Sequence, residues 1–181
     1  AVLLDVGTNP DPKAEMMYQF GVLGSVYARN VFHIPDPRVA LMNIGTEEEK
    51  GSLLSRAAFE LMKDSDEFNF VGNIEGRDVF KDKCDVIVCD GFTGNVILKL
   101  MESYYRMLVK RDLHDAYIER MNYENYGGTP LLGINSSVIV GHGISNHIAV
   151  KNMIHLAREV HEAGLSVKIR EALHHLSVNK E

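Results

Sequence analysis

Short apolar runs alternate with segments of helical periodicity along this chain, and no other feature restricts its fold as strongly. The expected strands are continuous apolar runs at residues 1–5, 39–44, 68–71, 86–89, 131–134 and 138–140. The expected helices lie at residues 14–30, after residue 49 to about 63, from 95 onward and from about 145 to 163. Such strands between helices are typical of a mostly parallel sheet covered by helices on both faces. We therefore predict an α/β fold with three α/β/α layers, forming a single domain over residues 1–181.

Composition narrows the class of protein further. The net charge of −6 argues against a protein that coats nucleic acid, because phosphate backbones select basic surfaces. No apolar stretch approaches the roughly 18 residues needed to cross a bilayer, and the first residues lack a secretory signal. Cys84 and Cys89 fall on one expected strand with side chains on opposite faces, which favours free thiols and a cytoplasmic setting. Residues 168–181 predict a last packed helix with a loose end.

Glycine stands beside an amide, hydroxyl or charged residue at the end of most expected strands. In parallel sheets ligands bind beyond these strand ends. Glycine lets the backbone approach a ligand closely, and helix N-termini favour anions. The alternative is ordinary turn chemistry between strand and helix. The predicted substrate- or phosphate-binding residues in these loops are Gly7, Asn9, Gly45, Thr46, Asn73, Gly91, Thr93, Gly94, Ser145 and Asn146.

Few cations lie close to these loops. Lys50, Arg77 and Lys99 follow glycine-bearing turns and could reach a phosphate, although each alone also fits an ordinary surface charge. Carboxylates at the same rim could orient a catalytic group, cap a helix or hold Mg²⁺, and for one of them, Asp78, capping is favoured. These acidic residues are Asp5, Glu75, Asp78 and Asp90.

His142 is the best histidine candidate, because it lies between two glycines where an imidazole could move a proton or bind an anion. The other histidines lack metal-ligand spacing, so no metal site is predicted. Cys89 could serve as a nucleophile, but a buried structural thiol is favoured. The segment 95–111 has an apolar stripe beside basic residues, which fits a core or dimer helix somewhat better than a membrane-surface helix.

Several segments resemble PlsX-type phosphate acyltransferases, in the order in which that family carries them. They include residues 3–9 (Leu-Leu-Asp-Val-Gly-Thr-Asn), 70–78 (Phe-Val-Gly-Asn-Ile-Glu-Gly-Arg-Asp), 88–96 (Val-Cys-Asp-Gly-Phe-Thr-Gly-Asn-Val), 126–133 (Tyr-Gly-Gly-Thr-Pro-Leu-Leu-Gly) and 141–146 (Gly-His-Gly-Ile-Ser-Asn). The resemblance covers nearly the whole chain. Members of the family are longer and begin with further strand and helix units, so this chain is similar to their C-terminal part.

The resemblance implies a fold similar to isocitrate and isopropylmalate dehydrogenases, and a homodimer. It implies transfer of a fatty acyl group from acyl carrier protein to inorganic phosphate, with no cofactor. The acyl phosphate would supply phospholipid synthesis through a glycerol-phosphate acyltransferase, so the protein is expected in the cytoplasm, with room for peripheral contact with the membrane.

In that reaction the preceding candidates would take distinct roles. His142, Lys50 and Asn95 form the predicted catalytic group, with His142 stabilising an oxyanion or handling a proton. Lys50, Arg77 and Lys99 would contact phosphate or the carrier's phosphopantetheine, and Asn73, Asn95 and Asn146 would position groups. Two alternatives stay open. One is a nicotinamide-dependent dehydrogenase on the related fold, although no clear cofactor loop is found, and the other is a non-catalytic fragment that binds the acyl carrier.

Overall fold

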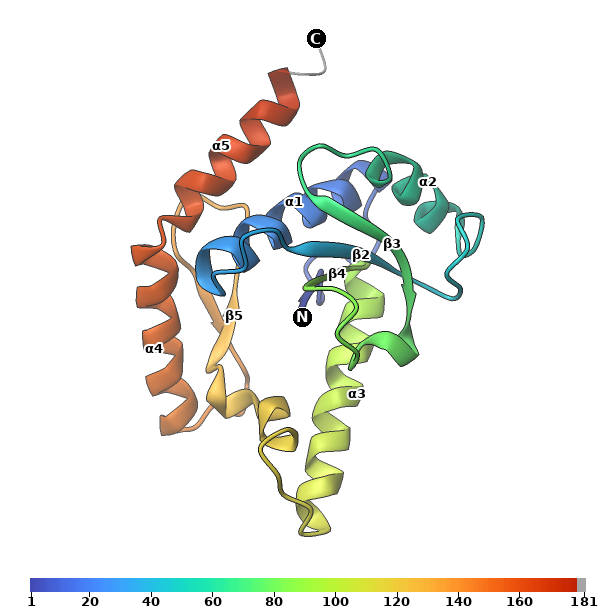
Figure 1. Cartoon of the computed structure of the whole chain (residues 1–181). Helices are drawn as coiled ribbons and strands as arrows, with labels where there is room; N and C mark the ends of the chain where they lie inside the picture. The colour runs from blue at the N-terminus through green and yellow to red at the C-terminus, as the bar shows by residue number, and fades with distance from the viewer. Residues whose placement is uncertain (179–181) are drawn as a thin grey trace. The chain divides into compact units, whose positions relative to one another are not determined.

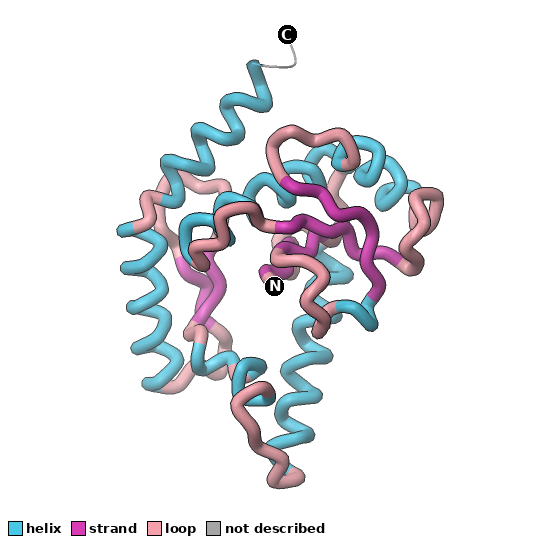
Figure 2. The backbone as a smooth tube through the Cα atoms, viewed as in Figure 1, coloured by secondary structure: helices cyan, strands magenta, loops and turns pink. Residues whose placement is uncertain are grey.

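The computed structural model describes the backbone of residues 1–178 and the side chains of residues 1–176. The chain divides into two compact units: unit 1 comprises Ala1–Asn95 and Glu171–Glu181, and unit 2 comprises Val96–Arg170. Each unit has a sheet of its own (Figures 1 and 2). A single domain over the whole chain stays a prediction.

Unit 1 is built on a parallel four-stranded sheet with the strand order β1-β4-β2-β3. Its strands are β1 (Val2–Leu4), β2 (Arg38–Asn43), β3 (Asn69–Glu75) and β4 (Val86–Val88). Leu4 and Leu41 both pair with Val88, so β1 and β2 flank β4 and end at the same level. The α/β prediction is confirmed, and the sheet flanked by helices is consistent with three α/β/α layers.

Two helices, α1 (Ala14–Val31) and α2 (Leu53–Met62), pack on each other and on this sheet. Gly24 lets α1 approach closely, because a Cβ at this position would overlap the Val86 side chain. Neighbouring side chains of a strand point to opposite faces. Ile87 therefore joins a cluster on the other face with Ala40, Ile74 and Cys84.

Unit 2 contains most of α3 (Gly91–Lys110) and two short 3₁₀ helices, η2 (Ile118–Met121) and η3 (Tyr123–Asn125). Strands β5 (Gly128–Pro130) and β6 (Ile139–Gly141) form an antiparallel pair, followed by α4 (His147–Glu162) and α5 (Leu165–Val178). Gly127 lies directly against α4, where a Cβ would overlap the backbone nitrogen of Met153. None of the helices within residues 1–178 is long and apolar enough to cross a membrane.

Three predicted boundaries differ from the structure. The helix expected from Asn95 begins at Gly91, so the loop expected at 91–94 is its first turn. The strand expected at 131–134 is wrong: Gly133 has a φ of 81°, and a turn there moves the pairing to residues 128–130. The last helix begins at Leu165 rather than about residue 168. Its expected loose end lies partly in residues 179–181, outside the described residues.

Candidate functional site

The C-terminal ends of the four parallel strands share one edge of the sheet in unit 1. Along this edge the loops follow the strand order: residues 5–9 after β1, 89–95 after β4, 44–51 after β2 and 75–78 after β3. Most of the predicted site residues therefore come together here: Gly7, Asn9, Gly45, Thr46, Lys50, Asn73, Arg77, Gly91, Thr93, Gly94 and Asn95.

Asp5 organises the first loop. Its carboxylate is buried, with 3% of the residue exposed, and accepts hydrogen bonds from the backbone amides of Gly7 (3.1 Å), Thr8 (3.2 Å) and Asn9 (2.5 Å). The side-chain amide of Asn9 adds a fourth bond at 3.1 Å. These amides hold the chain's own carboxylate, so the loop acquires its shape without an external anion. The sequence marked Asp5 as a rim carboxylate but not as this organiser.

The first turn of α3 is seated against the same loop. The amide of Gly91 donates to the carbonyl oxygen of Asn9 at 2.9 Å, and the side-chain amide of Asn95 donates to the Val6 carbonyl oxygen at 3.0 Å. A Cβ on Gly94 would overlap the Asp5 carbonyl oxygen. The glycines thus permit close approach of helix and loop, and the Asn95 side chain fastens the two.

Asp90 caps α3. Its carboxylate accepts from the amide of Thr93 at 2.8 Å and from the Thr93 hydroxyl at 2.7 Å. Carboxylates are favoured here because they satisfy free amides and complement the helix dipole. The Thr93 hydroxyl is therefore directed toward Asp90.

The two thiols are free and buried, at 5% exposed for Cys84 and 2% for Cys89. Burial raises the pKa of Cys89 to about 12 and that of Cys84 to about 11. The Cys89 thiol donates to the Asp5 carbonyl oxygen at 3.4 Å. Because a thiolate is the nucleophilic form, these surroundings support the structural interpretation of Cys89.

Two buried amide side chains fasten the loop after β2. Asn43 donates to the Lys50 carbonyl oxygen at 3.0 Å, and Asn73 donates to the Glu47 carbonyl oxygen at 2.9 Å. Thr46 and Lys50 are exposed on this loop. Within the described residues, the Lys50 ammonium group has no ion-pair partner.

Carboxylates dominate the loop after β3. Glu75 pairs with the exposed Arg77. Asp78 is 1% exposed, forms a capping box with Glu75 and accepts from Lys81 at 2.9 Å and Lys83 at 3.0 Å. These hydrogen-bonded cations hold the pKa of Asp78 well below its ordinary value. The capping role favoured for Asp78 is confirmed.

Unit 2 contains the remaining candidates. Ser145 donates from its hydroxyl to the His142 carbonyl oxygen at 2.7 Å. Asn146 caps α4, since its side-chain oxygen accepts from the amides of Ile148 and Ala149 at 3.0 Å each. Its amide nitrogen donates to Glu124 at 2.7 Å. Asn146 therefore clamps η3 to the start of α4.

His142 contacts three groups of unit 2. Its Nε2 lies 3.3 Å from a carboxylate oxygen of Glu102, and its Nδ1 accepts from the Ile144 amide at 3.4 Å. The ring centroid of Tyr123 lies 5.0 Å from that of His142. Glu102 was not predicted, because its position on α3 is distant in sequence from His142.

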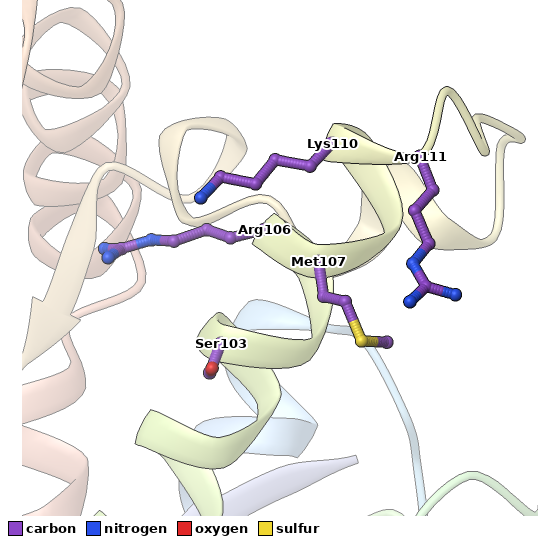
Figure 3. Close-up of a pocket in the computed structure, with 5 residues that line it drawn as sticks. All are labelled: Ser103, Arg106, Met107, Lys110 and Arg111. Carbon is purple, nitrogen blue, oxygen red and sulfur yellow. The ribbon is translucent and has the colours of Figure 1, made fainter.

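Lys99 is exposed on α3, and a cationic cluster lies at the C-terminal end of this helix, formed by Arg106, Lys110 and, one residue beyond the helix, Arg111. Together with Ser103 and Met107 this cluster lines a pocket of about 360 Å³ (Figure 3). Figure 3 shows the Arg106 and Lys110 side chains extending to the same side of the helix. In the part of the chain that the structure describes, no ion pair neutralises these three cations.

Comparison with known proteins shows the family to which the chain belongs. The family model for "Fatty acid synthesis protein" matches residues 1–111 and 106–168. A protein of Acidobacterium capsulatum named phosphate acyltransferase is 42% identical over an alignment of 187 positions, which covers 93% of this chain and 55% of the relative's own length. Proteins of the same name from Dictyoglomus thermophilum and Halothermothrix orenii are 38% and 42% identical, over 96% and 87% of this chain and 57% and 53% of their own lengths. The chain thus spans about half the length of these curated relatives. It belongs to the fatty acid synthesis protein family, which confirms the resemblance to phosphate acyltransferases predicted from its sequence.

Proposed function

We propose that this chain is part of a phosphate acyltransferase that moves a fatty acyl group from acyl carrier protein to inorganic phosphate. The name shared by the relatives supports acyl transfer over hydride transfer. The observation that carries the proposal is the loop after β2. The buried Asn43 and Asn73 fasten this loop by hydrogen bonds to its carbonyl oxygens, while Lys50 is exposed on it without an ion-pair partner among residues 1–176.

The reaction needs a held nucleophile and a stabilised oxyanion. An oxygen of hydrogen phosphate attacks the thioester carbonyl carbon, the new C–O bond forms and the C–S bond breaks, and the departing thiolate takes up the proton that the phosphate loses. No oxidant or reductant is required. Lys50 supplies a mobile positive charge for the phosphate, and Thr46 with Gly45 supplies a hydroxyl and a close backbone approach.

The other predicted residues take supporting roles. Asn73, Asn95 and Asn146 each donate to a protein oxygen, which favours positioning of loops and helix ends over direct contact with substrate. Gly7, Asn9, Gly91, Thr93 and Gly94 shape the join between the first loop and α3. In unit 2 we assign His142 to oxyanion stabilisation or proton handling, and Ser145 to substrate or phosphate binding.

Acyl carrier protein is the proposed acyl donor. Arg77 and Lys99 would meet anionic groups of the substrates, and the cationic cluster of Arg106, Lys110 and Arg111 suits the phosphodiester of the carrier's prosthetic group. Such a surface favours association that weakens as salt is added.

The proposal extends to a cytoplasmic homodimer that touches the membrane peripherally and supplies a glycerol-phosphate acyltransferase. An exposed apolar row on α3 supports a contact with a second copy of the chain or with the membrane. It consists of Val96, Leu100, Tyr104 and Met107, with Leu100 68% exposed. Their spacing of three and four residues places them on one side of the helix.

Acyl phosphate formation from acyl carrier protein and phosphate, trapped with hydroxylamine, tests the proposal. We would assay this chain alone and as a joined protein, in which the chain is fused to the C-terminus of the N-terminal half of a full-length relative. In the active form, Lys50→Ala and His142→Ala are expected to lower the rate by about 100-fold each. Lys63→Ala is the matched control, because that lysine ends α2 and pairs with Glu60 at the surface.

Two outcomes are informative beyond the expected one. If the joined protein is active while the chain alone binds acyl carrier protein without turnover, the chain by itself is a carrier-binding fragment. A joined protein that folds but makes no acyl phosphate would overturn the acyltransferase proposal.

A further inference from the structure

We propose that Glu102 is a positioning residue for His142: its carboxylate fixes the proton of the neutral imidazole on Nε2 and holds the ring in one orientation. Glu102 lies on α3, only 18% of its side chain is exposed, and it approaches Nε2 to 3.3 Å. The pair joins residues 40 positions apart in the sequence, both within unit 2. The catalytic part of this inference rests on the proposed role of His142.

The surroundings of the ring select one tautomer. A neutral imidazole carries a proton on one nitrogen and a lone pair on the other. With the proton on Nδ1, that N–H would face the Ile144 amide and the Nε2 lone pair would face the Glu102 carboxylate, and both contacts would be repulsive. With the proton on Nε2, Nδ1 accepts from Ile144 and the carboxylate meets a positive hydrogen.

Further contacts limit rotation of the ring. Tyr123 lies over it at 5.0 Å with an interplanar angle of 35°, and the Tyr123 hydroxyl donates to the Ile144 carbonyl oxygen at 3.2 Å. Ser145 bonds the His142 carbonyl oxygen through its amide at 3.0 Å and its hydroxyl at 2.7 Å. The backbone and one ring face are therefore held from separate elements, and Glu102 determines the remaining edge.

Glu102 also lines a second pocket, of about 290 Å³, beside the His142 ring partner Tyr123. Tyr105, Arg106 and Glu124 contribute further polar groups to its wall. The Glu102 carboxylate therefore borders both the His142 imidazole and this pocket.

Nitrogen-15 NMR of the histidine side chains of this chain tests the pairing without any assay of activity. In the wild type, the Nε2 of His142 is expected to give the signal of a protonated nitrogen and Nδ1 that of an unprotonated one. In Glu102→Ala, both signals should move toward the averaged values of free imidazole. Glu102→Asp withdraws the carboxylate by one methylene and should move them less, and it serves if the alanine variant does not fold.

The matched control is Glu119→Ala, since Glu119 lies 3.6 Å from Nδ1 of a different histidine, His114. This variant should move the His114 signals and leave those of His142 in place. Unchanged His142 signals in a folded Glu102→Ala variant would overturn the inference.

Activity gives an independent check. In the active joined protein, Glu102→Ala is expected to lower kcat by about 10- to 100-fold, because an imidazole displaced by about 1 Å is no longer aligned with the reacting atoms. Added to His142→Ala, the same change should cost nothing further, since Glu102 acts through the imidazole. If the losses of kcat from Glu102→Ala and His142→Ala add up in the double variant, the positioning role is contradicted. If the His142 nitrogen signals behave as expected but the joined protein is inactive, the proposed function alone fails.

Discussion

The Asp5 carboxylate accepts a 2.5 Å hydrogen bond from the backbone amide of Asn9 and a 3.1 Å bond from the Asn9 side chain. Such bonds to a charged acceptor are stronger than those between neutral groups. They close the loop after β1 from within and bring the Asn9 carbonyl oxygen to the amide of Gly91. One buried carboxylate therefore shapes both the loop and the start of α3.

Asp5→Asn tests this relationship. The substitution removes the charge, and an amide group offers one acceptor oxygen where the carboxylate offers two. We expect the free energy of unfolding to fall by about 2–3 kcal/mol, as measured by urea denaturation. Asp11→Asn, at an exposed position of the following loop, is expected to change it by less than about 0.5 kcal/mol. Equal effects of the two changes would contradict the organising role of Asp5.

Gly94→Ala tests the close approach of α3 to the end of β1. The added Cβ would overlap the Asp5 carbonyl oxygen and come 2.9 Å from the Cys89 sulfur. Neither the backbone nor the buried thiol can move away easily, so we expect the free energy of unfolding to fall by about 1–3 kcal/mol. The higher helix propensity of alanine is too small to offset this loss. Thermal melting followed by circular dichroism would report the loss.

Gly76→Ala is the matched control for that change. Nothing lies within 4 Å of a Cβ built on Gly76. Its melting temperature should therefore stay near that of the wild type. A Gly94→Ala protein as stable as the control would show that the helix can shift to accommodate the methyl group.

Acid sensitivity should depend on Asp78. Its pKa is lowered in the folded protein by hydrogen bonds from Lys81 and Lys83. A lowered folded pKa stabilises the fold above the unfolded value of about 3.9, and this contribution is lost as pH falls below it. The difference in urea midpoint between wild type and Asp78→Asn should be largest near neutral pH and shrink below about pH 4.

Asp82→Asn provides the comparison for Asp78. The Asp82 side chain is 94% exposed and pairs with Arg38 at the surface, where ion pairs contribute little. Its urea midpoint should track that of the wild type across the same pH range. A constant gap for Asp78→Asn at every pH would place its effect in packing rather than in charge.

Much of unit 1 could be predicted, because its central strands are buried on both faces of the sheet and its first helix has apolar residues at helical spacing. The run around Val86 is one example, and the helical spacing from Ala14 is another. The start of α3 was harder to predict. Gly91 and Gly94 suggest a loop, whereas Asp90 caps a helix that contains both glycines. Capping by a carboxylate three residues before Thr93 was the available signal.

The candidate site was predictable in its loops and not in its internal contacts. Glycines beside amides indicated which strand ends to examine, and parallel pairing brings those in unit 1 to one edge. The bond from Asn95 to Val6 and the pairing of His142 with Glu102 join residues 89 and 40 positions apart. Spacing along a sequence carries no information on contacts of that range, because they depend on how elements pack.

Burial of both cysteines has a practical consequence for testing the proposed reaction. Thiol reagents react with the thiolate at an accessible sulfur, and the pKa values of about 11 for Cys84 and about 12 for Cys89 leave almost none of it at neutral pH. The folded chain should therefore be nearly silent in a colorimetric thiol assay. If the proposed acyl transfer takes place, each carrier thiol that it releases could be counted as it forms, against a background that rises only when the protein unfolds.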